Sequence, residues 1–473
     1  MKKQCSSRRM VPAALLLAAA GPAAAQLSNY WPVNEASGAP ATTVNSVGGG
    51  TNGTLNSGAA VVTDGSRGQV LEFNVAGAYV DAGTIPVLNT ASNFTWSFWA
   101  NSTQGGSNNV IIGNRYSTTA ATEFSPREFV KFTTNAFEWH VNAGGQNIDY
   151  PAIATNTWNH FAVVKQGNLM FSYRNGLIDG SRYITAGTNN PQPLFFGGNG
   201  SLESWAGRLD DVATWTNPMP GRSVVGLANG AYTPTSAPQT ANALPTLATD
   251  NFSSLAGWTP TTRGLENNGP AGYNAPSNGG GVLSLSGTVT SQYWFGNSVE
   301  SVTSYDATKP TEVSIERVSL SGSGTSYRSS LWILGDDGHY LHFSQNANEG
   351  GWSWNARDDG GQGTLGPTGS GNNLAGLDGL DADFGSHVMS ISLEPVGTPG
   401  DVNMYMYLDG VLAGAQGFSN FPDTFKVVLT GQGRAIGDSV DARFDNLQIN
   451  QIPEPTATVT LALAGLALLR RRR

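Results

Sequence analysis

The chain has only one cysteine, Cys5, in 473 residues. Cys5 lies in an N-terminal segment that we expect to be removed during export, so the mature protein would carry no thiol, disulfide or thiolate metal site. Residues 26–452 are numerous enough for two domains of about 200 residues each, which need no covalent cross-links to fold. The fold must therefore be held by its hydrophobic cores alone.

Charged residues are also scarce, at 12 % of the chain, and acidic residues outnumber basic ones. Without the charged residues of the two terminal segments described below, 17 Lys and Arg remain against 33 Asp and Glu, a net charge near −16. Such a surface repels nucleic acid and anionic lipid, whereas it suits calcium ions or neutral sugars. The 60 glycines, with abundant Ser, Thr and Asn, favour short strands and tight turns over helices.

The first 25 residues have the pattern of a secretory signal peptide. Four basic residues precede an apolar stretch at 11–20, and three alanines at 23–25 offer a cleavage site. We therefore expect the mature chain to begin at Gln26. Arg8-Arg9 leaves the twin-arginine export route open beside the ordinary secretory route.

Residues 452–473 form a second terminal signal. Pro453-Glu454-Pro455 cannot join a regular helix or strand, a 14-residue uncharged run follows at 456–469, and four arginines close the chain. The run is shorter than the roughly twenty residues of a relaxed membrane-spanning helix, and the arginines would stay on the cytoplasmic side. The alternative interpretation is a hydrophobic C-terminal strand with a basic end.

This order of segments resembles the PEP-CTERM sorting signal of exported bacterial proteins. The resemblance implies transient membrane insertion of the C-terminal helix and cleavage by an exosortase-type enzyme. Pro453, Glu454 and Pro455 would be the recognised residues. The implied location is the cell surface or the extracellular space of a Gram-negative bacterium.

Short strand patterns separated by glycine-rich turns fill residues 26–232. Residues 94–98 alternate so that Phe94, Trp96 and Phe98 share one face of a sheet. The dipeptide at 175–176 is Asn-Gly, which favours a two-residue hairpin turn. Because no long amphipathic helix pattern is present, the sequence predicts an antiparallel β-sandwich.

Five motifs in this region carry a family resemblance. They are Tyr30-Trp31-Pro32, FTWSFWA at 94–100, WNHFAVV at 158–164, YRNG at 173–176 and WAGRLDDV at 205–212. In this order they resemble the laminin-G-like domains of the concanavalin A-type jelly roll. The resemblance implies a β-sandwich over the whole first domain, but lectins, adhesion modules, spacers and glycosidases share that fold, so it implies no single activity.

A second domain follows at residues 249–450 and repeats the first in outline. The hairpin glycines Gly176 and Gly410 lie 34 and 35 residues before the carboxylates Asp210 and Asp445, respectively. We therefore predict an all-β chain with two antiparallel concanavalin A-like jelly-roll sandwiches in tandem, between a cleaved signal and a sorting helix.

The two predicted domains are joined by residues 233–248. This stretch contains three prolines and no charged residue. The composition predicts a semi-extended linker.

Asp210 and Asp211 are the candidate metal ligands. Calcium prefers oxygen ligands from carboxylates and carbonyl groups at loop rims, and jelly rolls often have acidic residues at this position. In the alternative interpretation, one carboxylate holds a neighbouring turn and the other is solvated.

Trp352 and Trp354 are the candidate glycan platform. They lie two residues apart in a strand pattern and so share one face. An exposed aromatic face of this kind binds sugars when amides and carboxylates lie at its rim. The alternative is that both rings pack between the two sheets.

Catalytic patterns are weak. His339 and His342 lie three apart in a strand pattern and would point to opposite faces, so they are not expected to share a metal. Gly437-Asp438-Ser439 resembles a lipase nucleophile block, but no histidine follows His387 to act as its base. A jelly-roll glycosidase needs two carboxylates on one face, and the sequence offers no such cluster. We therefore predict no catalytic residue.

Three function classes remain open. The favoured one is a non-enzymatic surface or matrix protein that binds extracellular polysaccharide or a surface protein through its jelly rolls. The first alternative is a glycoside hydrolase acting on polysaccharide. The second is a purely structural spacer without a ligand.

Overall fold

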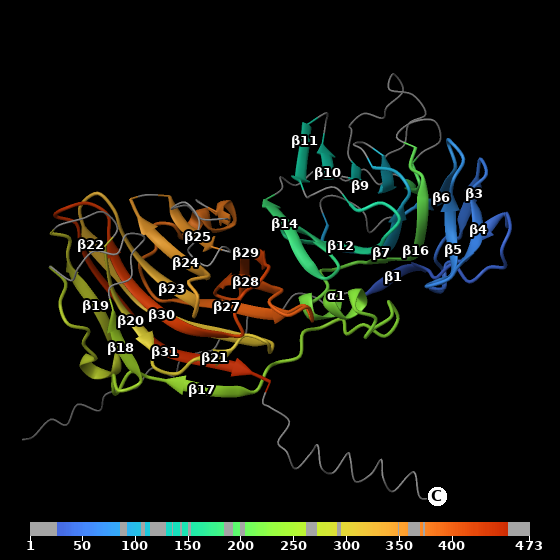
Figure 1. Ribbon diagram of the computed structural model, residues 1–473. Coiled ribbons are helices and arrows are strands. Elements are labelled where there is room, and N and C mark those ends of the chain that lie inside the picture. Colours follow the sequence, from blue (N-terminus) through green and yellow to red (C-terminus); the bar gives the residue numbers. More distant parts are fainter. Residues whose placement is uncertain are drawn as a thin grey trace, which may run out of the picture.

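The computed structural model describes residues 26–85, 92–105, 109–113, 129–134, 136–141, 144–149, 153–183, 193–198, 204–261, 272–290, 295–348, 350–357, 369–371 and 374–452. Their strands pair antiparallel in four sheets, which form two sandwiches side by side (Figure 1). The predicted all-β class and antiparallel pairing are confirmed. Both predicted terminal signals, residues 1–25 and the segment from Pro453 onward, lie outside the described residues.

The first sandwich consists of sheets A and B. Sheet A has, in spatial order, β14 (Leu177–Tyr183), β13 (Leu169–Arg174), β12 (Trp158–Gln166), β7 (Phe94–Ser102), β16 (Gly207–Trp215), β5 (Gly68–Phe73) and β4 (Ala60–Asp64), with β1 (Leu27–Trp31) also paired to β16. Sheet B has β11 (Gly144–Asp149), β10 (Ala136–Val141), β9 (Phe129–Thr133), β8 (Val110–Gly113), β15 (Pro193–Phe196), β6 (Tyr79–Thr84), β3 (Gly53–Asn56) and β2 (Thr42–Thr43).

The core of this sandwich lies between its two sheets. Phe94, Trp96 and Phe98 of β7 are fully buried there, as their alternation in the sequence predicts. Phe98 packs edge-on against Phe132 of sheet B, with ring centroids 5.2 Å apart. The alternating strand thus sets which face of sheet A meets sheet B.

The second sandwich consists of sheets C and D. Sheet C has, in spatial order, β17 (Thr246–Asp250), β31 (Ser439–Gln451), β22 (Thr311–Ser323), β27 (His387–Pro395), β28 (Val402–Leu408) and β29 (Val411–Phe418), with β19 (Leu283–Thr288) also paired to β31. Sheet D has β18 (Trp258–Thr261), β20 (Phe295–Ser301), β30 (Thr424–Gly433), β23 (Tyr327–Gly335), β24 (Tyr340–Ala347), β25 (Gly351–Arg357) and β26 (Gly369–Gly371), with β21 (Tyr305–Asp306) also paired to β30.

Helices are few among the described residues. These residues include one α-helix, α1 (Gly221–Ala228), and two short 3-10 helices, η3 (Gly279–Gly281) and η4 (Ala375–Leu380). In this part of the chain, no helix has the length and apolar character needed to span a membrane.

The two sandwiches pack against each other through a buried apolar cluster. It combines residues of sheet A and α1 with residues of β28 and β29 (Figure 1). At its centre the Tyr173 hydroxyl lies 3.1 Å from the Tyr405 hydroxyl. At its edge Arg222 Nε donates a hydrogen bond to Glu394 Oε1 over 2.8 Å. The sequence did not predict this contact.

The predicted linker differs from its expected form at both ends. Ala237 is buried in the cluster between the sandwiches, and the Ser223 hydroxyl donates to the Pro238 carbonyl over 2.6 Å. At the other end β17 already begins at Thr246. Part of residues 233–248 is therefore packed, because apolar side chains at the junction are buried together with those of α1.

Candidate functional site

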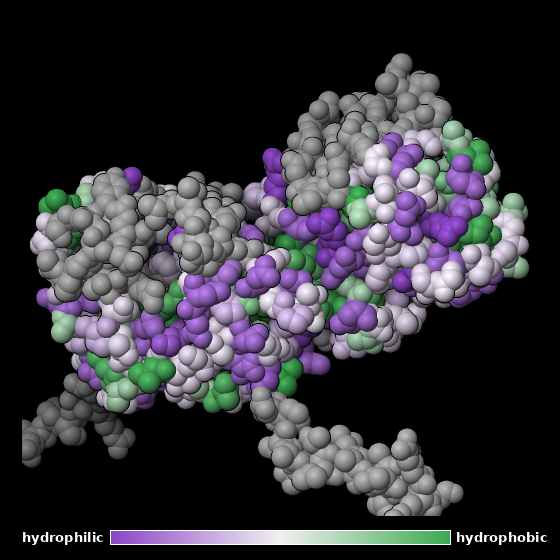
Figure 2. Space-filling view, viewed as in Figure 1, coloured by the Kyte–Doolittle hydropathy of each residue, from purple (hydrophilic) through white to green (hydrophobic). Residues whose placement is uncertain are grey.

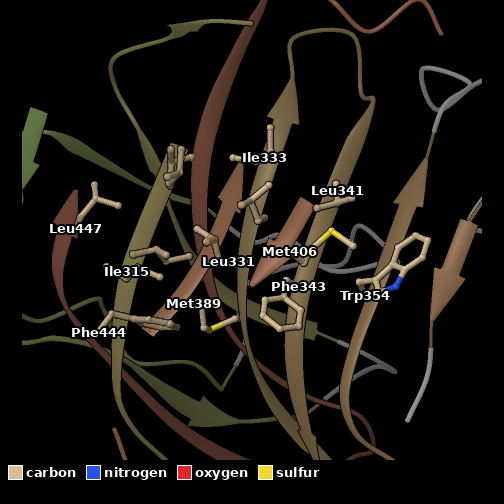
Figure 3. Packing of buried hydrophobic residues seen from close by; sticks show 14 of the residues in the cluster. Ile315, Leu331, Ile333, Leu341, Phe343, Trp354, Met389, Met406, Phe444 and Leu447 are labelled. Atoms are coloured by element: carbon tan, nitrogen blue, oxygen red, sulfur yellow. The ribbon is translucent and has the colours of Figure 1, made fainter. Parts of the chain in front are cut away.

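The outer face of sheet D, the face turned away from the core, carries many buried polar side chains. Side chains alternate between the two faces of a strand. Leu331 and Ile333 of β23, with Leu341 and Phe343 of β24, point into the core (Figure 3). The residues between them in sequence therefore lie on the outer face.

Five hydroxyl side chains lie side by side across this outer face, one on each of five neighbouring strands. In order from β20 to β25 they are Ser298, Thr430, Ser330, Ser344 and Ser353. We call this set the hydroxyl row. Each of its members is at most 1 % exposed. Four strand spacings separate its ends, which is roughly 19 Å.

An aromatic pair lies along one side of the hydroxyl row. The Trp332 and His342 rings, on paired positions of β23 and β24, are stacked with centroids 4.3 Å apart. Trp332 Nε1 donates to Thr430 Oγ1 in the row over 3.3 Å. Burial, and secondarily the charge of Arg328, lowers the pKa of His342 well below its usual value, so its imidazole is neutral at physiological pH.

Amide side chains lie along the other side. Arg328 of β23 pairs in register with Gln432 of β30 and Asn346 of β24, and its Nε donates to Gln432 Oε1. Asn346 Nδ2 donates to Ser353 Oγ over 2.7 Å. The hydroxyl row thus lies between an aromatic and an amide border.

Several polar atoms of this face have no hydrogen-bond partner among the described residues. They are Ser330 Oγ, both ring nitrogens of His342, and Asn346 Oδ1. Buried polar atoms of native proteins are nearly always paired, with protein, water or a ligand. These residues are at most 9 % exposed, so their unpartnered atoms lie in a buried part of the outer face and are not open to a ligand from solvent.

A pocket of about 380 Å³ lies at one end of the same face. It is lined by Glu300, Leu334, Lys426 and the turn 335–338. The first three of these residues lie on the outer face by the strand register. Lys426 Nζ donates to Glu300 Oε1 over 2.9 Å, and Asp336 and Asp337 of the turn add two further carboxylates to the lining.

The predicted metal ligands Asp210 and Asp211 bind an arginine. Arg67 donates from Nε to Asp210 and from Nη2 to Asp211, over 2.8 and 2.7 Å. Burial, followed by the charge of Asp211, raises the pKa of Asp210 to about 7. The Arg67 guanidinium lies 4.3 Å from the centre of the Trp99 ring and supplies the positive charge that calcium would bring. Among the described residues no group of three or more His, Cys, Asp or Glu could hold a metal ion.

The pair also has a structural role, but both carboxylates have partners, whereas the alternative interpretation left one of them solvated. Asp211 has a left-handed backbone, with φ of 50°, at an irregularity where β16 pairs with β7. Its N–H donates to Asp210 Oδ1 over 2.8 Å, and the Tyr30 hydroxyl donates to Asp211 Oδ1 over 2.6 Å. The two carboxylates therefore fix the irregular part of β16.

The predicted glycan platform at Trp352 and Trp354 is wrong. The two side chains do share one face, but it is the core face of sheet D, and they are only 0 % and 6 % exposed. Figure 3 shows Trp354 beside core residues that include Leu341 and Met406. The alternative interpretation, packing between sheets, is the correct one.

The rejected catalytic candidates have structural partners. His339 Nδ1 lies 2.7 Å from Asp337 Oδ1 in the turn before β24, apart from His342 on the outer face. Asp438 accepts four backbone N–H bonds, from Thr325, Ser326, Arg434 and Ala435. It joins two loops.

The hydroxyl row is not apparent from the sequence alone. Its signal is a hydroxyl side chain at one outer-face position of each strand, such as Ser330 between Arg328 and Trp332 in β23. That pattern can be read strand by strand, but the row itself depends on the order and register of strands distant in sequence.

Comparison with known proteins supports the fold of the first sandwich. Residues 74–224 match the family model Laminin_G_3, of the concanavalin A-like lectin/glucanases superfamily. No curated protein matches the chain.

Three solved structures are among those to which the chain shows some similarity. Domain 4 of an extracellular arabinanase from Geobacillus stearothermophilus, in complex with arabinotriose, is 15 % identical, with 43 % of this chain and 99 % of that chain covered and a TM-score of 0.36. A β-glucanase from Bacillus licheniformis is 16 % identical, with 46 % and 100 % covered and a TM-score of 0.31. The binding domain of Paraclostridial Mosquitocidal Protein 1 is 10 % identical, with 85 % and 91 % covered and a TM-score of 0.34. With its family match and its two packed antiparallel sheets, the segment 74–224 of this chain is a concanavalin A-like jelly-roll domain.

Proposed function

We propose that this chain is an exported, non-enzymatic protein that binds glycan or a partner protein through its jelly-roll domains. The observation that carries the proposal is the match of residues 74–224 to the concanavalin A-like lectin/glucanases superfamily, in a domain whose two sheets pack as a sandwich. Lectins, which bind sugars, give that superfamily part of its name.

A hydrolase acting on polysaccharide is the second candidate. Glycosidases place two carboxylates around the bond that they cleave. Among the described residues Glu300, Asp336 and Asp337 line one pocket, but Lys426 pairs with Glu300 and the Thr424 hydroxyl donates to Asp336. Measured hydrolysis of plain polysaccharides would favour this candidate over binding.

Export is supported by the two terminal segments of the sequence. A secretory pattern precedes Gln26, and at the other end of the chain Pro453-Glu454-Pro455 is followed by an apolar run and four arginines. Each of the two segments is typical of an exported protein. We expect the secreted or surface form to lack everything after the Pro-Glu-Pro region. Mass spectrometry of that form tests this, and intact peptides from 461–473 would contradict the sorting proposal.

A glycan array, run with and without calcium, tests the binding proposal. We expect at least one glycan to bind the secreted form of the chain. An array without any signal in the presence of calcium would favour a structural spacer.

A further inference from the structure

We infer that the contact between the two sandwiches is a pH-dependent device, which holds while the buried Glu394 side chain carries a proton and loosens when that proton is lost. Glu394 belongs to β27 of the second sandwich and meets Arg222 of α1, beside the first sandwich. Such a device acts on the relative placement of the two sandwiches, whichever ligand they bind.

Glu394 and Arg222 belong to different bodies. Each sandwich has its own core between its own two sheets. Arg222 lies at the start of α1, which is attached to the first sandwich because Thr95 Oγ1 of β7 accepts the Met219 N–H over 2.9 Å. Glu394 lies on the outer face of sheet C, since the preceding Leu393 points into the core of the second sandwich. Opening of the contact therefore separates the two side chains.

The Glu394 carboxyl group is poorly prepared to carry a charge in the closed contact. Its residue is only 6 % exposed. Oε1 accepts a hydrogen bond from Arg222 Nε over 2.8 Å, whereas the buried Oε2 has no hydrogen-bond partner among the described residues. A buried charge is costly unless it is both paired and fully hydrogen-bonded, and a neutral carboxyl group avoids most of that cost. The closed contact therefore favours the protonated form.

Two charged neighbours act on Glu394 in opposite directions. Arg222 favours the carboxylate, but its side chain is 29 % exposed, so water screens its charge. Glu312 of β22 is a second acid and opposes the ionisation of Glu394. Burial outweighs Arg222, and the pKa of Glu394 rises from 4.5 to about 7.

Tyrosines provide the remaining titratable groups around Glu394. They are Tyr173 of β13 and Tyr405 and Tyr407 of β28. Burial raises the pKa of each tyrosine well above its usual value, so all three stay neutral where Glu394 titrates. Glu394 is therefore the group whose charge changes at this contact near neutral pH.

The direction of the effect follows from these surroundings. When the contact opens, Glu394 meets water and its pKa returns toward 4.5, so opening releases a proton between pH 4.5 and about 7. The contact is therefore tightest below pH 4.5 and weakens as the pH rises to about 7. A contact held by an ion pair of Arg222 and Glu394 would show the opposite dependence, because it needs the carboxylate.

One backbone amide reports the contact directly. The Ile178 N–H of β14 donates to Asn403 Oδ1 of β28, across the contact, over 2.8 Å. Amide hydrogen exchange in the whole chain, followed by mass spectrometry that resolves single residues, measures how often this bond opens. Because intrinsic exchange also depends on pH, the parent protein is compared with a variant at each pH.

Glu394→Gln is the variant for this comparison, since it keeps the size of the side chain and stays neutral at every pH. We expect equal protection of Ile178 in the parent and the variant at about pH 5. At about pH 8 protection in the parent should be lower by about tenfold or more, since each pKa unit corresponds to a factor of ten in the opening equilibrium. The Trp96 amide, inside sheet A, is the control and should be protected equally in both proteins.

Two results would overturn the inference. Equal protection of Ile178 in the two proteins at about pH 8 would show that the contact does not respond to this proton. Better protection in the parent at that pH would show that Arg222 and Glu394 hold the contact as an ion pair.

A second variant keeps the test decisive if Glu394→Gln does not fold. Arg222→Gln removes the charge that favours the carboxylate, so Ile178 should lose more protection in this variant than in the parent between about pH 5 and 8. An equal or smaller loss in the variant would contradict the role given to Glu394.

Discussion

Asn403 of β28 binds the backbone at Ile178 in the other sandwich as a neighbouring strand would. Its Oδ1 accepts the Ile178 N–H over 2.8 Å, and its Nδ2 donates to the Gly176 carbonyl, also over 2.8 Å. One side chain thus satisfies two backbone groups across the contact between the sandwiches.

The first prediction concerns this contact. Asn403→Ala leaves two buried backbone groups unpaired, and each costs about 1–3 kcal/mol. We expect a lower free energy of unfolding in urea and a larger radius of gyration in X-ray scattering. The exposed Gln448→Ala is the control. An unchanged radius together with unchanged stability would show that the apolar cluster alone holds the contact.

The second prediction concerns independence of the second sandwich. Residues 246–452 have their own core between sheets C and D, so this fragment should unfold cooperatively. It should be less stable than in the whole chain, because Tyr405 and Ala415 lose the side chains that bury them. Calorimetry of fragment and whole chain measures both. An insoluble fragment without a transition would mean that the two sandwiches fold only together.

The third prediction is a pH dependence at Glu394. Burial raises its pKa from the ordinary 4.5 to about 7, with the charge of Arg222 acting in the opposite direction and that of Glu312 adding to the rise. The folded state therefore holds a proton that the unfolded state has released between these values. The contribution of Glu394 to stability is full below pH 4.5 and is lost as the pH rises to about 7.

Glu394→Gln tests this dependence, because it keeps the shape and removes the titration. We expect a flatter profile of stability against pH between 4.5 and 7 in the variant than in the parent protein. Urea unfolding at a series of pH values measures it. Two parallel profiles would assign the pH dependence to other groups.

The fourth prediction concerns calcium at Asp210 and Asp211. Since Arg67 already donates to both carboxylates, calcium should not change the melting temperature. Arg67→Ala leaves the mostly buried Asp210 without its ion-pair partner and should destabilise the first sandwich. A saturable rise of the melting temperature of the unaltered chain with calcium would restore the metal interpretation.

The sequence predicted those parts of the fold that depend on local pattern. The alternation at Phe94, Trp96 and Phe98 was enough to find the core face of β7, because the neighbouring motifs identified a known type of sandwich. The same alternation at Trp352 and Trp354 showed only that the two rings share a face. Which face it is depends on the pairing of β25 with β24 and on the packing of sheet C.

Contacts between distant residues could not be predicted in the same way. Arg67 and Asp210 are 143 residues apart, and nothing in either segment identifies the other as its partner. The hydroxyl row needs five strands in an order that differs from their order in the chain. The surface in Figure 2 gives little help, because on the face shown its hydrophobic patches are small and separate among the described residues.

The last strand, β31, determines how the protein would resist a pulling force applied at its C-terminal end. β31 pairs with β22 along its whole length, from Gln451 opposite Thr311 to Ser439 opposite Ser323, and its other edge pairs with β17 and β19. Gln451 also donates from its side chain to the Asp306 carbonyl and to Thr311. A force applied at Ile452, along the axis of β31, acts on these hydrogen bonds together rather than one after another. A chain attached through its C-terminal end would therefore carry mechanical load through the best-connected strand of its second sandwich.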